Sequence, residues 1–465
     1  MTDQPNRTPR SPRSPREPRR ATSLPRERGN AWRNWSGGVQ ERSQLTAGPT
    51  SETAVKALVI GASGSGLKVK TVGAGHSFND IAATDGLRLH LDDYRGLVSV
   101  NPETMVATFR GGTRLHELPG LLKPHGLALA NQGDVDEQAI AGAISTGTHG
   151  TGLGFTGLSA MVKSLRLCLA DGSIVYCDER MHPELFAHAR VGLGALGIIL
   201  EVGMQCVPAF RIEATEGAEP VDEVLERFAE RSRTADHHEF FWFPHADRAF
   251  VKTNRRLAEG ELPSPDALPL GAVTRFVDAE IVQNWGHGLA ASIGAVAPGM
   301  VPRVNQLSAG LMGTRKYVAD AHQVFVSARR VRFNEMEYAV PFDDGMEVMR
   351  EIRRVVEAGD WRVSFPIEVR SAAADDVPLS TAYDRESVYI AVHRYVREPH
   401  LEYFGAVEQV LRAAGGRPHW GKLHTMDAAG LAAAYPRFGE FVALRDEVDP
   451  QRVFGNAYLE RVLGG

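Results

Sequence analysis

This chain of 465 residues has few cysteines and no long apolar runs. Outside its first thirty residues it also has little basic charge relative to acidic charge. No stretch of about 18 apolar residues exists that could span a bilayer, and the N-terminus lacks the apolar segment of a secretory signal. The three cysteines, Cys168, Cys177 and Cys206, form no CxxC motif and have no histidine at zinc spacing. We therefore expect a cytoplasmic protein with reduced thiols and no transmembrane segment, disulfide framework or metal site.

The charge is distributed unevenly along the chain. Residues 1–30 contain eight arginines and three acidic residues, a balance of +5, whereas the whole chain carries -5, so the remainder carries -10. A body this acidic argues against a nucleic-acid partner, because neutralising phosphates needs clustered Lys and Arg. The first thirty residues repeat Ser-Pro-Arg and contain little that a core could bury, which predicts a disordered basic tail. A nucleic-acid or membrane-surface arm is the alternative for this tail.

Two α+β domains are predicted after the tail, over residues 31–208 and 209–465. The first has short elements: a helix that starts near Thr50, a strand over 68–72, and hairpins over 98–109 and 165–176, the last turning at Asp171-Gly172. A helix over 113–123 is also expected. The second has longer elements, namely strands at 239–243, 331–340, 364–370 and 387–395 and a helix over 346–356. Residues 255–320 are poorly periodic and receive no assignment.

Glycines at 61, 64 and 66 suggest a Rossmann dinucleotide fingerprint, but two features exclude it. Their spacing is GxxGxG where GxGxxG is required. The predicted order is also helix, glycines, strand, whereas the Rossmann motif runs strand, glycines, helix. We interpret this segment as the end of a helix.

Two other small-residue segments indicate a bound anion or nucleotide. The predicted strand over 68–72 runs into the loop 73–78, whose backbone N–H groups can converge on an anion. Taken alone, this loop and its histidine, His76, are weak evidence. The segment 142–152 is rich in glycine and hydroxyl residues, which let the chain lie flush against a polar ligand. Residues 131–136 and 194–199 supply further small and polar positions.

These segments resemble the FAD domain of the vanillyl-alcohol-oxidase-type flavoproteins. Residues 332–341 (RFNEMEYAVP) and 417–422 (RPHWGK) narrow the resemblance to the sugar-lactone oxidoreductases, which include L-gulonolactone oxidases and dehydrogenases and D-arabinono-1,4-lactone oxidases, with alditol oxidases more distant. The similarity covers roughly residues 31–463. It implies a two-domain α+β fold: a PCMH-type FAD-binding domain over 31–208, and a substrate or cap domain over 209–465 whose segment 417–465 returns to the flavin.

The resemblance implies FAD as the cofactor, bound covalently through His76, which matches the histidine of the family's Gly-His-Ser loop. It also implies a set of cofactor-binding residues: Gly73, Ala74, Gly75, His76, Ser77, Phe78, Gly133, Asp134, Gly142, Ser145, Thr146, Thr148, His149, Gly150, Gly194, Gly197, Ile198 and Ile199. Asn456 also falls near the end of the family pattern, where it either touches the flavin or belongs to a packing turn.

Four residues of the second domain are candidates for the substrate site. Glu368 and Arg370 lie two apart in a predicted strand, so their side chains share one face, where they either bind vicinal hydroxyls or form an ordinary ion pair. The resemblance favours the first reading, because Glu368, Arg370 and Lys422 match the polyol-contacting residues of alditol oxidases. His393 stands where those enzymes have threonine, and Ala391 where they have histidine. This departure points to a lactone before an open-chain polyol.

Oxidation of a carbinol carbon requires a cofactor, because no protein side chain accepts a hydride. The family chemistry implies that the C2 hydrogen of a sugar-1,4-lactone passes to flavin N5 while the C2 hydroxyl loses a proton, giving a 2-keto lactone and then an ascorbate-type enediol. Arg370 and Lys422 would stabilise the charge on oxygen. We expect Arg370 to lower the pKa of Lys422 enough to make it the base, with His393 competing for this role.

Other functions are compatible with some of these sequence features. An alditol or secondary-metabolite alcohol oxidase, or a flavin reductase, would use the same fold with a different substrate. A non-enzymatic flavin-binding protein with a nucleic-acid-binding tail is a fourth reading, which the acidic body disfavours. The electron acceptor is expected to be oxygen or a redox protein or quinone.

Overall fold

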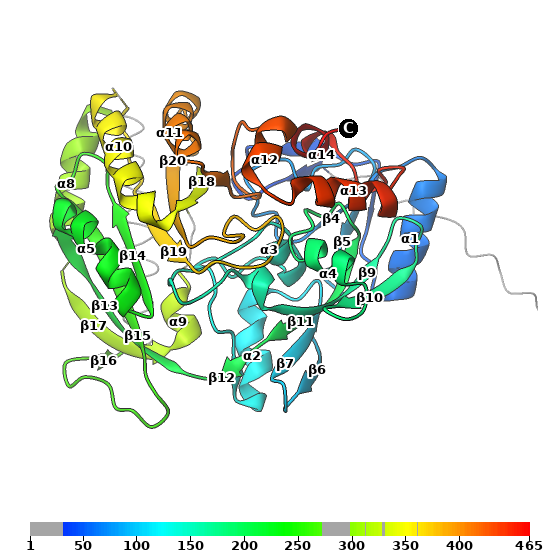
Figure 1. Cartoon of the computed structure of the whole chain (residues 1–465), viewed down its shortest axis with the longest axis horizontal. Coiled ribbons are helices and arrows are strands. Elements are labelled where there is room, and N and C mark those ends of the chain that lie inside the picture. The colour runs from blue at the N-terminus through cyan, green and yellow to red at the C-terminus, as the bar shows by residue number, and fades with distance from the viewer. Residues whose placement is uncertain (1–30, 272–297, 312, 328–330, 360) are drawn as a thin grey trace, which may run out of the picture.

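The computed structural model describes residues 31–271, 298–311, 313–327, 331–359 and 361–465. The predicted disordered tail, residues 1–30, lies outside the described residues. The described chain forms two lobes, one from the N-terminal third together with the C-terminal helices and one from the middle of the chain (Figure 1). The α+β class is confirmed, since both lobes mix helices and sheets.

The first lobe holds a parallel three-stranded sheet in the order β3-β5-β4 and an antiparallel five-stranded sheet in the order β10-β9-β11-β7-β6. Its strands are β1 (Ala31–Arg33), β2 (Gln40–Arg42), β3 (Leu45–Ala47), β4 (Val69–Val72), β5 (Leu87–His90), β6 (Leu97–Asn101), β7 (Val106–Arg110), β8 (Leu127–Ala128), β9 (Val162–Cys168), β10 (Ile174–Asp178), β11 (Ile198–Gln205) and β12 (Val207–Pro208). Its helices are α1 (Glu52–Gly64), α2 (Leu118–Leu122), α3 (Ile140–Ser145) and α4 (Pro183–Ala189).

Local sequence signals determine most of these elements. The Ser51 hydroxyl accepts the Ala54 N–H at 3.2 Å and so starts α1, which buries Val55, Leu58, Val59 and Ala62. Both predicted hairpins are confirmed, as β6-β7 and β9-β10. The predicted helix over 113–123 is instead α2 flanked by two short 3₁₀ helices, because Pro119 and Pro124 each sit in the first turn of a new helix. Helix α1 runs through Gly64, which confirms that the glycines at 61–66 end a helix.

A nine-stranded sheet in the order β16-β17-β13-β15-β14-β19-β20-β18-β21 forms the second lobe. Its strands are β13 (Arg211–Pro220), β14 (His237–Trp242), β15 (Arg248–Arg256), β16 (Leu268–Pro269), β17 (Arg315–Asp320), β18 (Phe333–Pro341), β19 (Ile367–Ala372), β20 (Ser387–Tyr395) and β21 (Arg417–Pro418). The helices are α5 (Val221–Thr234), α8 (Val301–Leu311), α9 (Ala321–Phe325), α10 (Gly345–Ala358) and α11 (Leu401–Ala413). The four predicted strands and the helix correspond to β14, β18, β19, β20 and α10. Within the unassigned segment 255–320, residues 272–297 and 312 lie outside the described residues.

The chain then returns to the first lobe through α12 (Ala428–Ala434), α13 (Phe438–Val448) and α14 (Ala457–Leu463), seen in red beside α1 and β4 in Figure 1. The Val69 N–H donates to the Val453 carbonyl at 2.8 Å, which joins β4 to this segment. Asn456 caps α14 and donates to the carbonyls of Asp80, Ile81 and Ala83. These contacts are those of a packing turn, one of the two roles predicted for Asn456. The boundary between residues 208 and 209 stays a prediction.

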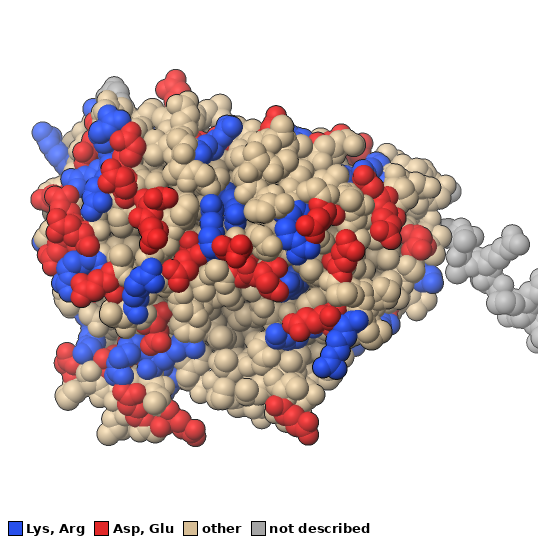
Figure 2. Space-filling view, viewed as in Figure 1, with Lys and Arg blue, Asp and Glu red and all other residues tan. Residues whose placement is uncertain are grey.

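The surface and the thiols show ordinary features. Acidic and basic side chains are interspersed over both lobes on the face shown in Figure 2. Within the described residues, no helix has both the length and the apolar character needed to cross a membrane.

Cys168, Cys177 and Cys206 are free and buried, as expected, and burial raises the pKa of each thiol, to about 11, 12 and 11 respectively.

Candidate active site

A first cavity lies between β4 with its following loop, α3, and the segment that leads into β11. It contains most of the predicted cofactor-binding residues: Gly73, Ala74, Gly75, His76, Ser77, Gly142, Ser145, Thr146, Gly194, Gly197, Ile198 and Ile199. Small side chains make this wall possible. A Cβ at Gly142 would meet no atom within 4 Å and would project into open space, and Gly75, with φ +68°, turns the loop against Trp32.

A second cavity adjoins the first, and the two share His76, Ser77, Gln138 and Thr146 in their walls. It contains the remaining predicted residues except one: Phe78, Gly133, Asp134, Thr148, His149, Glu368, Arg370, His393 and Lys422. The exception is Gly150, which lines neither cavity. A Cβ there would come within 2.4 Å of the Gln132 carbonyl oxygen, so packing accounts for this glycine.

His76 lies where the two cavities meet. Its ring stacks on Trp35 with centroids 5.5 Å apart and an angle of 20° between the planes. Burial lowers the pKa of His76, which favours the neutral imidazole. Its Nδ1 atom is buried and has no hydrogen-bond partner among the described residues. A buried polar atom is seldom left without a partner, so this nitrogen points to a ligand.

Strands β18, β19 and β20 supply the charged floor of the second cavity. In the strand register Glu335 is opposite His393, and Glu337 and Glu368 are both opposite Ala391. Because paired residues of neighbouring strands point to the same face, all of these side chains lie on one side of the sheet. The small side chain of Ala391 leaves room between the two carboxylates.

Arg370 binds three carboxylates. It forms an ion pair with Glu368, as their two-residue spacing predicts, and its other contacts are Glu239 at 3.0 Å and Asp134 at 3.5 Å. Burial alone would lower the pKa of Arg370, but these carboxylates raise it. The guanidinium is therefore a fixed cation at the cavity wall.

Lys422 pairs with Glu335, Nζ to Oε2 2.5 Å, and lies 5.0 Å from the centre of the Phe78 ring. Burial alone would lower the pKa of Lys422, but Glu335 and Glu337 raise it. The prediction that this pKa is lowered was therefore wrong, because carboxylates on β18 dominate the surroundings of Lys422. These carboxylates favour the protonated form of Lys422.

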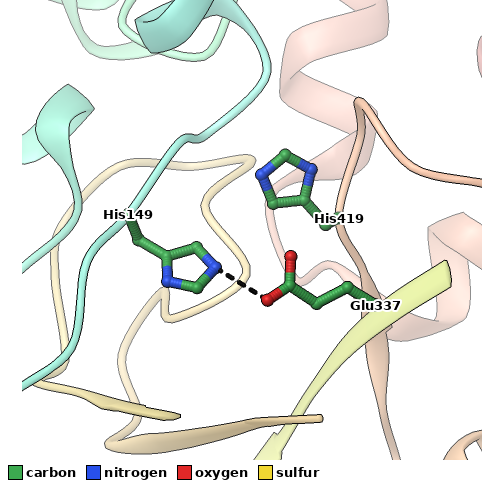
Figure 3. Close-up of side chains that lie close together, drawn as sticks. All are labelled: His149, Glu337 and His419. Atoms are coloured by element: carbon green, nitrogen blue, oxygen red, sulfur yellow. Dashed lines mark ion pairs between the residues drawn. The ribbon is translucent and has the colours of Figure 1, made fainter. Parts of the chain in front are cut away.

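His149, Glu337 and His419 meet in the wall of the second cavity, and they come from a loop of the first lobe, from β18 and from the segment after β21 (Figure 3). His149 Nε2 is 3.3 Å from Glu337, its Nδ1 is 2.9 Å from the Gly150 carbonyl, and its ring stacks on Tyr389. Both nitrogens of His149 thus face acceptors, which fixes the orientation of its ring. His419 differs: its Nδ1 accepts the Gly421 N–H at 3.0 Å, and burial lowers its pKa to about 3, so its ring is neutral.

Sequence reasoning missed Glu239, Glu335, Glu337 and His419 as members of the site. The signal for two of them was present, since Glu335 and Glu337 alternate with Asn334 and Met336 along a strand that is otherwise suited to burial. Carboxylates two apart on such a strand share one face, as Glu368 and Arg370 do. Glu239 and His419 carried no comparable local signal.

Comparison with known proteins identifies the family. Residues 202–462 match the family described as D-arabinono-1,4-lactone oxidase, and residues 43–178 match an FAD binding domain. The L-gulono-1,4-lactone dehydrogenase of Mycobacterium tuberculosis (strain ATCC 25618 / H37Rv) is 41% identical over 433 residues, which cover 93% of this chain and 99% of that protein. The L-gulonolactone oxidase of Bos taurus is 32% identical over 442 residues, covering 94% and 98%.

Among solved structures, cholesterol oxidase from B. sterolicum superposes with a TM-score of 0.80 over 94% of this chain and 97% of that one. At 16% identity this match shows the fold alone. The predicted fold class and family are both confirmed. The chain belongs to the D-arabinono-1,4-lactone oxidase family of FAD-dependent oxidoreductases.

Proposed function

We propose that this protein oxidises a neutral sugar-1,4-lactone, such as L-gulono-1,4-lactone, at its C2 hydroxyl to a 2-keto lactone. The observation that carries this proposal is the junction of the two cavities at His76, with Arg370 and Lys422 in the wall of the second cavity. The relatives named above are lactone oxidoreductases. Alditols and other alcohols are the competing substrates.

The first cavity suits FAD by the chemistry of its wall. Its glycines leave backbone N–H groups close to the ligand, and Thr71 Oγ1 and His76 Nδ1 are two buried polar atoms without partners among the described residues. When bound, FAD supplies the two-electron acceptor that oxidation of an alcohol requires. We propose that residues 73–77 and 142–146 and the segment 194–199 hold it, and that an imidazole nitrogen of His76 bonds covalently to the flavin.

The charges of the second cavity favour an uncharged substrate. Asp134, Glu335, Glu337 and Glu368 line it together with Arg370 and Lys422, and both cations are already paired with carboxylates. A substrate carboxylate would have to enter beside these anions, which costs free energy at short range. Hydroxyl groups can donate to the carboxylates and accept from the cations without adding charge. The intact lactone therefore fits better than the aldonate that its hydrolysis yields.

We assign the cations and His393 different roles in the reaction. Arg370 and Lys422 hold the reacting oxygen and stabilise the negative charge that develops on it. The carboxylates that raise the pKa of both cations keep them protonated for this task. His393 Nδ1 donates to the Pro366 carbonyl at 2.9 Å, so in the neutral ring Nε2 carries the lone pair. We propose that Nε2 takes the hydroxyl proton, with Glu335 3.5 Å away to stabilise the resulting imidazolium.

Anaerobic flavin reduction tests the substrate. Purified holoprotein is mixed without oxygen with L-gulono-, L-galactono- and D-arabinono-1,4-lactone, with xylitol and with NADPH, and flavin absorbance is followed. We expect a lactone to bleach the flavin fastest; bleaching by xylitol or NADPH alone would replace the proposal with an alditol oxidase or a flavin reductase. Adding oxygen or cytochrome c to the reduced protein then identifies the electron acceptor.

A further inference from the structure

Lys70, in β4, is a buried lysine in the wall of the first cavity. Its relative exposure is 3%, and it lines the cavity together with Gly194 and Phe454. Its ammonium donates to the Gly194 carbonyl at 3.3 Å and to the Phe454 carbonyl at 3.1 Å. An ammonium has three donors, so these two bonds leave one N–H for a further acceptor.

No carboxylate of the described residues forms an ion pair with Lys70. Two charged residues of the α13 region face it, Asp449 and Arg445. The Asp449 oxygens accept the backbone N–H groups of Val453 and Phe454 at 2.7 and 2.8 Å. Burial and the charge of Arg445 lower the pKa of Lys70 to about 7, against a smaller opposing effect of Asp449. A buried cation is expected to have an anionic partner, and here the protein supplies none at contact distance.

The position of Lys70 indicates which half of FAD it meets. His76 marks the end of the first cavity that opens into the second, and this end must take the flavin ring if the ring is to reach the substrate. Lys70, Gly194 and Phe454 line only the first cavity. From His76 the wall runs back through the loop 73–75 to β4, an extended strand that rises about 3.3 Å per residue. The nucleotide end of a dinucleotide placed this way lies at Lys70.

We propose that Lys70 binds the adenylate half of FAD, with its ammonium donating to an oxygen of the adenylate phosphate. This inference rests on FAD as the cofactor and not on the identity of the substrate. The phosphate would be the anionic partner that Lys70 lacks within the protein, while the carbonyls of Gly194 and Phe454 orient the ammonium. Thr71, the next residue of β4, also lines this cavity, and its Oγ1 is buried without a partner among the described residues.

A pH dependence of cofactor binding follows from this contact. The phosphate raises the pKa of Lys70 when FAD binds. In the protein without FAD this pKa is about 7, so at a higher pH binding of FAD takes up a proton. FAD affinity is thus full below pH 7 and falls by up to about tenfold per pH unit above it, until the pKa of the complex is passed. FMN lacks the adenylate half, and its affinity would not follow this curve.

The test measures flavin retention in a His76→Ala background, which removes the covalent bond. Holoprotein loaded with FAD or FMN is diluted, and released flavin is measured by its fluorescence between pH 7 and 9. Lys70→Met is expected to weaken FAD binding about 10- to 100-fold at pH 7, as loss of a charge-assisted hydrogen bond does, to leave FMN binding within twofold, and to flatten the pH curve for FAD. The matched control is Lys68→Met, because Lys68 lies two residues upstream, is half-buried, donates to the Gln451 carbonyl and does not line the cavity.

Three outcomes would overturn the inference. These are unchanged FAD affinity in Lys70→Met, equal losses for FAD and FMN, and a flat pH curve for FAD in the His76→Ala protein that retains Lys70. The last measurement decides the matter even if Lys70→Met fails to fold. Absence of FAD from the purified protein that retains His76 would instead remove the cofactor assignment on which the inference rests.

Discussion

Removal of the Lys422 ammonium, as Lys422→Met, is expected to destabilise the second lobe strongly. Lys422 Nζ lies 2.5 Å from Glu335, whose side chain is 8% exposed, and it also lowers the pKa of Glu337. At an effective dielectric constant of about 20, the Coulomb attraction at this distance is about 7 kcal/mol, most of which offsets the cost of desolvating both ions. Removing one partner leaves a buried carboxylate uncompensated. The free energy of unfolding should therefore fall by about 3 to 5 kcal/mol.

A double-mutant cycle with Glu335→Gln separates this effect from loss of packing. Because the double variant has neither charge, it should recover 1 kcal/mol or more relative to the sum of the two single changes, an amount typical of coupled neighbours (about 0.5 to 3 kcal/mol). The assay is urea unfolding followed by far-UV circular dichroism at pH 7 with fixed protein and FAD concentrations. A loss below about 1 kcal/mol for Lys422→Met, or strict additivity in the cycle, would refute the reasoning.

Three further predictions concern Arg370, His393 and His238. Arg370→Lys keeps the positive charge but loses the planar guanidinium that contacts Glu368 and Glu239. Stopped-flow reduction of the flavin by lactone should therefore slow about 100-fold, the effect of losing one oxyanion donor. A change below twofold would contradict the role of Arg370. His393→Gln removes the proposed base, so reduction of the flavin by lactone at pH 7 should slow about 100-fold or more, and a change below twofold would assign the base elsewhere. His238 is buried with a pKa lowered to about 3 by desolvation, so it resists protonation in the folded state, whereas the unfolded chain takes up a proton below about 6.5. Stability is thus lost as the pH falls below 6.5, by about 2 kcal/mol between pH 7 and 5 for this residue. His238→Gln should show a correspondingly smaller acid loss in urea unfolding, and an equal loss would argue against a buried neutral ring.

Short-range patterns predicted much of the fold. The helix start near Thr50 and the Asp171-Gly172 turn are signals contained in a few residues, and each produced the expected element. The strand into the loop 73–78 is also local, and its residues line the first cavity. The predicted helix over 113–123 differed because Pro119 within it and Pro124 directly after it permit helix starts but interrupt a continuous helix.

The charges of the second cavity depend on pairing between distant strands. The environment of Lys422 is set by Glu335, 87 residues earlier, through the register of β18 with β20 and the turn after β21. No local pattern states which strand lies beside which, so the sign of the shift in the pKa of Lys422 was predicted wrongly. The same limit explains why Glu239, which reaches Arg370 from β14, went unrecognised. Residue identities indicated the chemistry, and the long-range pairing assigned the roles.

Anaerobic reduction of the flavin by L-gulono-1,4-lactone carrying deuterium at C2 tests the central claim most directly. If the C2–H bond breaks in the step that reduces the flavin, bleaching at saturating lactone should be several-fold slower than with the unlabelled compound, and a label at C3 should have no comparable effect. Equal rates for the C2-labelled and unlabelled lactones, or slowing only by a label at another carbon, would contradict the account.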